Sequence, residues 1–78
     1  MDLIEITAKV DARGLSCPMP IVCTAQAVKP MASGAHLEVL ATDPGSIKDF
    51  AAWCRSTGNT LVEQTSDGAV YRFVIRRK

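Results

Sequence analysis

The sequence carries little net charge and no long hydrophobic segment. Nine Lys and Arg against eight Asp and Glu leave a formal net charge of +1, so no general field attracts nucleic acid or an anionic membrane. No apolar run approaches the roughly 18 residues that cross a bilayer. The start, Met1-Asp2-Leu3-Ile4-Glu5, lacks the basic and apolar regions of a secretory signal. We therefore expect a cytoplasmic protein without membrane or direct nucleic-acid contacts.

Histidine and suitably spaced cysteines are also scarce. His36 is the only histidine, and Cys17, Cys23 and Cys54 show no C-x-x-C or similar metal-ligand spacing. An odd number of cysteines without a signal argues against a disulfide framework. Cys17 and Cys23 would point about 240° apart on a helix. We therefore expect reduced thiols and no metal site.

The composition that is present is that of a small globular domain. The chain has 78 residues, of which 47% are hydrophobic and 22% charged, close to the average for soluble domains. This length predicts one domain over residues 1–78, with a small core.

The hydrophobic pattern predicts six elements. Alternation of apolar residues indicates strands, and an apolar stripe at i, i+4, i+7 and i+11 indicates the first helix. The expected elements are a strand over 4–10, a helix from Cys17 to about Lys29, a strand over 37–42, a helix between Asp43 and Gly58, and strands over 60–66 and 69–76. The order β-α-β-α-β-β predicts a two-layer α/β sandwich, with both helices covering one face of a four-stranded sheet.

Proline and glycine are expected to set the boundaries of these elements. Pro30 either ends the first helix near Lys29 or kinks it. Asp43 and Pro44 can cap and begin the second helix, and Gly58 suits its C-terminal cap. Asp67-Gly68 is typical of a hairpin turn.

The segment Cys17-Pro18-Met19-Pro20 is the candidate site. The residue before a proline avoids the α region, which predicts Cys17 at the N-cap and Pro18 at the first helical position. The N–H of Met19 would then point toward the sulfur, and the helix dipole would favour a thiolate. Such a thiolate could accept a sulfane sulfur and become a persulfide.

A structural role is the alternative for each thiol, because free cysteines often act as small buried hydrophobes. Cys54 lies on the apolar stripe of the second helix and is expected to be buried. Cys23 is expected to be partly exposed but not activated. On spacing alone, both roles remain open for Cys17.

Three motifs together resemble the TusA/SirA-like sulfur-carrier family with its CPxP motif. They cover nearly the whole chain and comprise Asp11-x-Arg13-Gly14-Leu15-x-Cys17-Pro18-x-Pro20, the segment from Asp43 to Gly58, and the segment from Asp67 to Arg76.

The resemblance implies a mixed sheet and a sulfurtransferase that acts as a persulfide carrier, with Cys17 as the reactive residue. It implies Pro18 and Pro20 as the frame of the site, and Arg13 and Gly14 as the preceding turn. We add Met19 to the frame because its N–H is expected to face the sulfur. It implies no metal or organic cofactor. The implied partners are a sulfur donor, either a cysteine desulfurase or a rhodanese-type protein, and an acceptor in tRNA thiolation, molybdenum-cofactor maturation or sulfur metabolism. We expect a monomer.

The chain departs from many relatives in its first helix, where residues 21–27 carry no charge. Partner choice therefore cannot be copied from relatives that are basic there.

Two other functions compete with the carrier. A protein- or RNA-binding module without thiol chemistry would need a basic face with aromatics. However, the alternation places Tyr71 and Phe73 together on the core face, with Arg72 opposite. A thiol redox protein would need a resolving cysteine near Cys17, and the spacing provides none.

Overall fold

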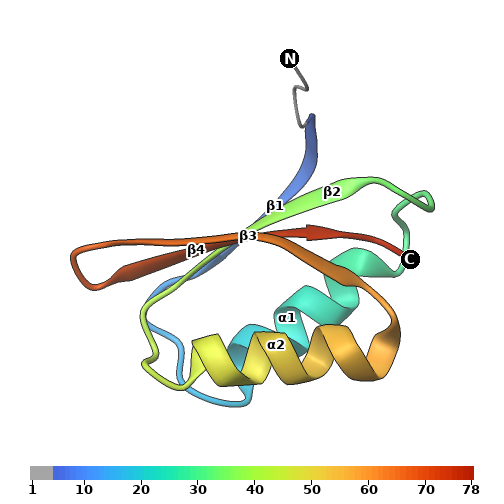
Figure 1. Ribbon diagram of the computed structural model, residues 1–78. Helices are drawn as coiled ribbons and strands as arrows, with labels where there is room; N and C mark the ends of the chain where they lie inside the picture. The colour runs from blue at the N-terminus through green and yellow to red at the C-terminus, as the bar shows by residue number, and fades with distance from the viewer. Residues whose placement is uncertain (1–4) are drawn as a thin grey trace.

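The computed structural model describes residues 5–78 (Figure 1). Its elements follow the predicted order β-α-β-α-β-β: β1 (Ile6–Ala12), α1 (Met19–Val28), β2 (His36–Ala41), α2 (Ser46–Thr57), β3 (Thr60–Asp67) and β4 (Val70–Arg76). Among these residues, no helix has the length and apolarity needed to cross a membrane.

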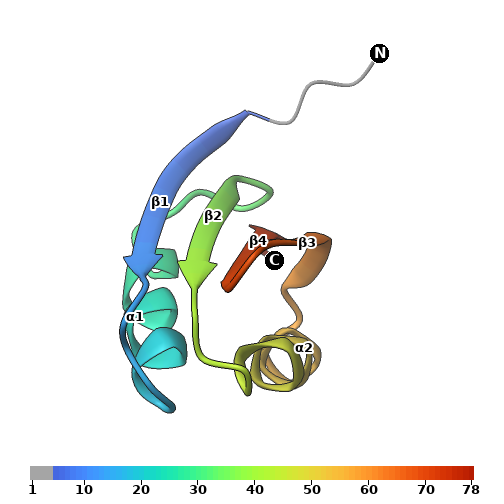
Figure 2. The ribbon, with the colours of Figure 1, turned by 90° about the vertical axis from the view of Figure 1, so that its left-hand side faces the viewer.

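The four strands form one mixed sheet in the order β1-β2-β4-β3. β1 and β2 are parallel, whereas β4 is antiparallel to both β2 and β3. Both helices lie on one face of the sheet, α1 below β1 and β2, and α2 below β3 and β4 (Figure 2). The predicted two-layer sandwich with a mixed sheet is therefore confirmed.

The core lies between the sheet and the helices. The predicted alternation in β2 is confirmed, because Leu37, Val39 and Ala41 are fully buried while their neighbours are only partly covered. The ring of Phe50 in α2 stacks on that of Phe73 in β4, with centroids 4.6 Å apart. These two rings attach α2 to the sheet.

The two helices end at the positions predicted from Pro30 and Gly58. α1 ends at Val28, and Pro30 follows its C-terminus, so the proline stops the helix rather than kinking it. The carbonyl of Val28 accepts hydrogen bonds from the Met31 N–H at 3.0 Å and from Nε of Arg77 at 3.0 Å. Gly58 ends α2 with φ +80°, the left-handed conformation expected of a glycine cap.

The first strand differs from its predicted range of 4–10, of which Ile4 lies outside the described residues. β1 continues through Asp11 and Ala12, which were expected to leave the strand. Ala12 pairs with Ala41 of β2 and is fully buried. Pairing across the sheet thus prolongs the strand beyond its alternating pattern.

The predicted C-terminal hairpin is present, but its two-residue loop is Gly68-Ala69, one residue later than the predicted Asp67-Gly68, because Asp67 pairs with Val70. Phe73 is buried, and Tyr71 packs against the core from a half-buried position. On the opposite face, Arg72 forms ion pairs with two glutamates, 2.6 Å from Glu38 and 3.1 Å from Glu63. The aromatic side chains of β4 therefore belong to the core.

Candidate functional site

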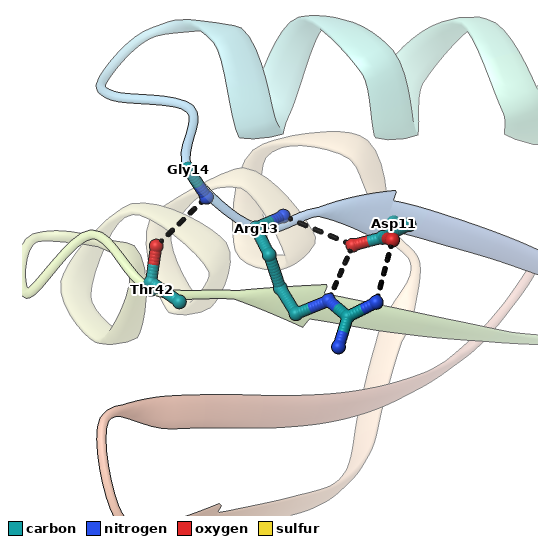
Figure 3. A network of polar contacts seen from close by, with 4 residues as sticks. All are labelled: Asp11, Arg13, Gly14 and Thr42. Carbon is teal, nitrogen blue, oxygen red and sulfur yellow. Dashed lines mark hydrogen bonds and ion pairs between the residues drawn. The ribbon is translucent and has the colours of Figure 1, made fainter.

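The connection between β1 and α1 begins with a turn held by polar contacts. The Asp11 carboxylate accepts hydrogen bonds from the backbone N–H, Nε and Nη2 of Arg13, at 3.1, 2.8 and 2.8 Å (Figure 3). These contacts lower the pKa of Asp11 to about 2. Gly14, at φ +80°, donates its N–H to Oγ1 of Thr42 at 2.9 Å. Arg13 and Gly14 thus fix the turn, and the Arg13 guanidinium is bound to Asp11.

Cys17 lies exposed in the same connection, before the first turn of α1. Its backbone N–H donates to Oδ2 of Asp43 at 3.2 Å, which joins the connection to the segment between β2 and α2. Cys17 is therefore held through its backbone while its side chain stays accessible.

The start of α1 differs from the prediction by one residue. Pro18, not Cys17, is the N-cap, and the helix begins at Met19 without a side-chain cap. The N–H of Met19 donates to the Ser16 carbonyl at 2.9 Å and is not available to the Cys17 sulfur. The predicted contact between them is wrong, because this N–H closes the turn that contains Cys17 and Pro18.

The electrostatics at the thiol also differ from the prediction. The Asp49 carboxylate beside the thiol raises the pKa of Cys17 above its ordinary value, because it favours the protonated form. The negative charge of Asp49, partial desolvation and the charge of Asp43 act in the same direction. These causes oppose the thiolate that was predicted at the helix N-terminus.

The start of α2 brings both carboxylates to the sulfur. The N-cap is Gly45, so neither Asp43 nor Pro44 has its predicted place in the helix. The Asp43 carbonyl, not its carboxylate, accepts the Ser46 N–H, at 3.0 Å. A Cβ added to Gly45 would lie 3.5 Å from Oδ2 of Asp43 and 3.8 Å from Oδ2 of Asp49. The two carboxylates thus flank Gly45, and the Asp43 carboxylate anchors Cys17 instead of capping α2.

The structure gathers the six predicted site residues in one connection and the first turn of α1: Arg13, Gly14, Cys17, Pro18, Met19 and Pro20. Met19 is exposed, and Pro20 is buried. Sequence reasoning missed Asp49, since no local pattern relates it to Cys17. Asp49 lies within the second motif of the family resemblance, but only Asp43 and Pro44 of that motif were given a role, as a helix cap.

The other two cysteines have different surroundings. Cys23, in α1, is half-buried. Cys54 belongs to the core cluster, and burial raises its pKa to about 11. Over residues 5–78, no pocket and no group of three potential metal ligands is found. The chemistry that this arrangement offers is that of one thiol on an open surface.

Fold and site together define a small α/β protein that displays a single exposed cysteine beside two carboxylates. The crystal structure of the SirA-like protein from Desulfitobacterium hafniense shares this fold, with a TM-score of 0.80 over 90% of this chain and 96% of that one, at 22% identity.

The family is given by the sequence comparisons. The family described as Sulfurtransferase TusA matches residues 8–77. The sulfur carrier protein TusA of Allochromatium vinosum is 41% identical over 75 residues, which cover 96% of this chain and 99% of the relative. The sulfur carrier protein TusA of Pseudomonas aeruginosa is 38% identical over 74 residues, 95% of this chain and 94% of the relative. The chain belongs to the TusA family of sulfur carriers.

Proposed function

We propose that Cys17 accepts a sulfane sulfur as a persulfide and passes it to a partner protein in a sulfur relay. One observation carries this proposal: Cys17 alone of the three cysteines is exposed, on a connection held by Asp43 and by the turn at Arg13 and Gly14. A carrier must present its sulfur to other proteins, and an open surface site allows this.

The loading reaction needs no redox partner. The Cys17 sulfur attacks the terminal sulfur of a donor persulfide, R–S–SH. A new S–S bond forms on Cys17, the S–S bond of the donor breaks, and the donor thiolate leaves and takes up the proton that Cys17 loses. The products are Cys17–S–SH and R–SH. Unloading repeats the exchange, with an acceptor nucleophile attacking the outer sulfur.

The donor would be a cysteine desulfurase or a rhodanese-type protein, acting on a cytoplasmic, monomeric carrier. The acceptor would serve tRNA thiolation, molybdenum-cofactor maturation or sulfur metabolism. The chain needs no substrate pocket for this role, because each partner supplies its own active site.

Mass spectrometry after incubation with a cysteine desulfurase and cysteine tests the proposal. We expect the protein to gain one sulfur atom, located on the peptide that contains Cys17. Cys17→Ser should gain none there, whereas Cys23→Ser should load like the original chain.

A failure would be equally informative. If desulfurase and rhodanese-type donors left Cys17 unloaded while alkylation showed its thiol to be free, the carrier role of Cys17 would be refuted. The binding module without thiol chemistry would then become the leading interpretation.

A further inference from the structure

Large apolar side chains are exposed around the Cys17 site. Within the described part of the chain, five such residues are exposed: Leu15, Met19, Val22, Ile47 and Val62. Leu15 lies in the connection before α1, and Met19 and Val22 lie in the first turns of α1. Both helices begin at the same end of the molecule (Figure 1). We call Leu15, Met19 and Val22 the apolar rim.

The members of the apolar rim lie close to Cys17 along the chain. Leu15 precedes Cys17 by two residues, and Met19 follows it by two. Val22 is three residues beyond Met19 and so shares its face of α1. Ile47 lies in the first turn of α2, but it points away from Asp49, two residues further along the helix, so it is left out of the apolar rim. Since α1 contains no charged residue, this surface has no positive charge of its own along the first helix.

Two carboxylates without an ion-pair partner among residues 5–78 lie beside the apolar rim. Asp43 and Asp49 form no ion pair with any residue in 5–78. Arg13, the basic residue of the turn before Cys17, is bound to Asp11 instead. The site therefore presents apolar groups and carboxylates around one thiol, and its missing complement is a cation.

We propose that the apolar rim, Asp43 and Asp49 form a docking surface for the sulfur-donor protein, whose contact face presents apolar side chains around an Arg or Lys that lies against the two carboxylates. This inference rests on the proposed function and adds the chemistry of the partner to it.

Such a cation would also favour the reaction itself. Cys17 must lose its proton in order to attack the donor persulfide, and negative charge at the sulfur is opposed by both carboxylates. A cation brought by the donor offsets that repulsion only while the donor is docked. Docking thereby activates the thiol, and the undocked carrier keeps its thiol protonated and unreactive.

Persulfidated tetrapeptides serve as probes of this docking surface. Four peptides combine a cysteine persulfide with either leucine or serine neighbours and with either arginine or glutamate. The rate of sulfur transfer to the full chain is followed by mass spectrometry. We expect the leucine and arginine peptide to load Cys17 fastest. It should exceed its glutamate counterpart by about tenfold at low ionic strength. This ratio should shrink at about 1 M salt, where the screening length is about 3 Å.

Matched variants separate the two contributions. Asp49→Asn should reduce the preference for arginine, whereas Glu5→Gln should preserve it. Glu5 precedes β1 and lies about 20 Å from the Cys17 end, given the rise of about 3.3 Å per strand residue. Met19→Ser combined with Val22→Ser should reduce the preference for leucine. Val62→Ser, which alters an exposed apolar residue on β3, should not.

The outcomes distinguish this inference from the proposed function. Equal loading by all four peptides, or faster loading by the glutamate peptides, would overturn the docking surface and leave Cys17 as the carrier. Loading by no peptide, with the Cys17 thiol free, would overturn both.

Discussion

Cys54 allows the effect of burial on thiol chemistry to be measured in this protein. It lies on α2 within the core, is 4% exposed, and has a pKa raised by burial from 9.0 to about 11. The unfolded chain loses this burial, so its thiol returns to the ordinary pKa. Two measurements detect this difference in pKa. One is the rate at which Cys54 is alkylated in the folded protein at moderate pH, and the other is the free energy of unfolding as the pH rises from 9 to 11.

The expected magnitudes come from the pKa shift. At about pH 8, a thiol of pKa 9 is about 10% ionised and one of pKa 11 about 0.1%. Cys54 should therefore alkylate at least ~100-fold more slowly in the folded chain than in the unfolded chain. Burial of the protonated Cys54 thiol contributes to the free energy of unfolding, and this contribution is fully present below about pH 9. As pH rises toward 11, the unfolded state loses the proton first, and about 2 to 3 kcal/mol of stability is lost.

The assay compares the original chain with Cys54→Ala by urea unfolding at several pH values between about 8 and 11. Other groups titrate in this range, but they are common to both proteins and cancel in the difference. At about pH 8, Cys54→Ala should be less stable by about 1 kcal/mol, because a small cavity replaces the sulfur. That deficit should disappear or reverse by about pH 11. A difference that does not change with pH, or rapid alkylation of Cys54 in the folded chain, would refute the reasoning.

Two further predictions concern the packing that holds the site. Phe50→Leu should cost about 2 kcal/mol, since it removes the stacked contact with Phe73 and part of a fully buried ring. In thermal unfolding this should lower Tm by about 8 to 16 °C, and an unchanged Tm would contradict the proposed role of the ring pair. Ser46→Ala should raise the free energy of unfolding by about 1 kcal/mol, because the buried Ser46 hydroxyl has no hydrogen-bond partner among residues 5–78. Urea unfolding checks this, and a loss of stability would show that the hydroxyl is needed.

The structure also changes how the candidate thiol is understood. The prediction from the sequence was a thiol activated by its own helix, whereas the structure gives a thiol restrained by the neighbouring helix. Under the proposed relay role, restraint would have a physical advantage, because a protonated thiol reacts slowly with stray electrophiles. Under the proposed docking, the reactivity of Cys17 would depend on the group that the donor brings to Asp43 and Asp49.

The sequence by itself determined the elements and their order. Alternation in residues 37–41 identified the buried face of β2, and Gly58 and Pro30 marked the ends of the two helices. Asp67-Gly68 indicated the hairpin. These features depend on local backbone preferences and on periodic burial, and both can be read from residues close together in the chain.

Tertiary structure alone decided the strand order and the chemistry of the site. β4 lies between β2 and β3, and pairing with β2 prolonged β1 to Ala12. The packing of α2 beside α1 brought Asp49 to Cys17, and the Asp43 carboxylate took the Cys17 N–H. A pKa depends on charges and hydrogen bonds within a few ångströms in space. Residues 17 and 49 are far apart in the sequence, and only the folded chain makes them neighbours.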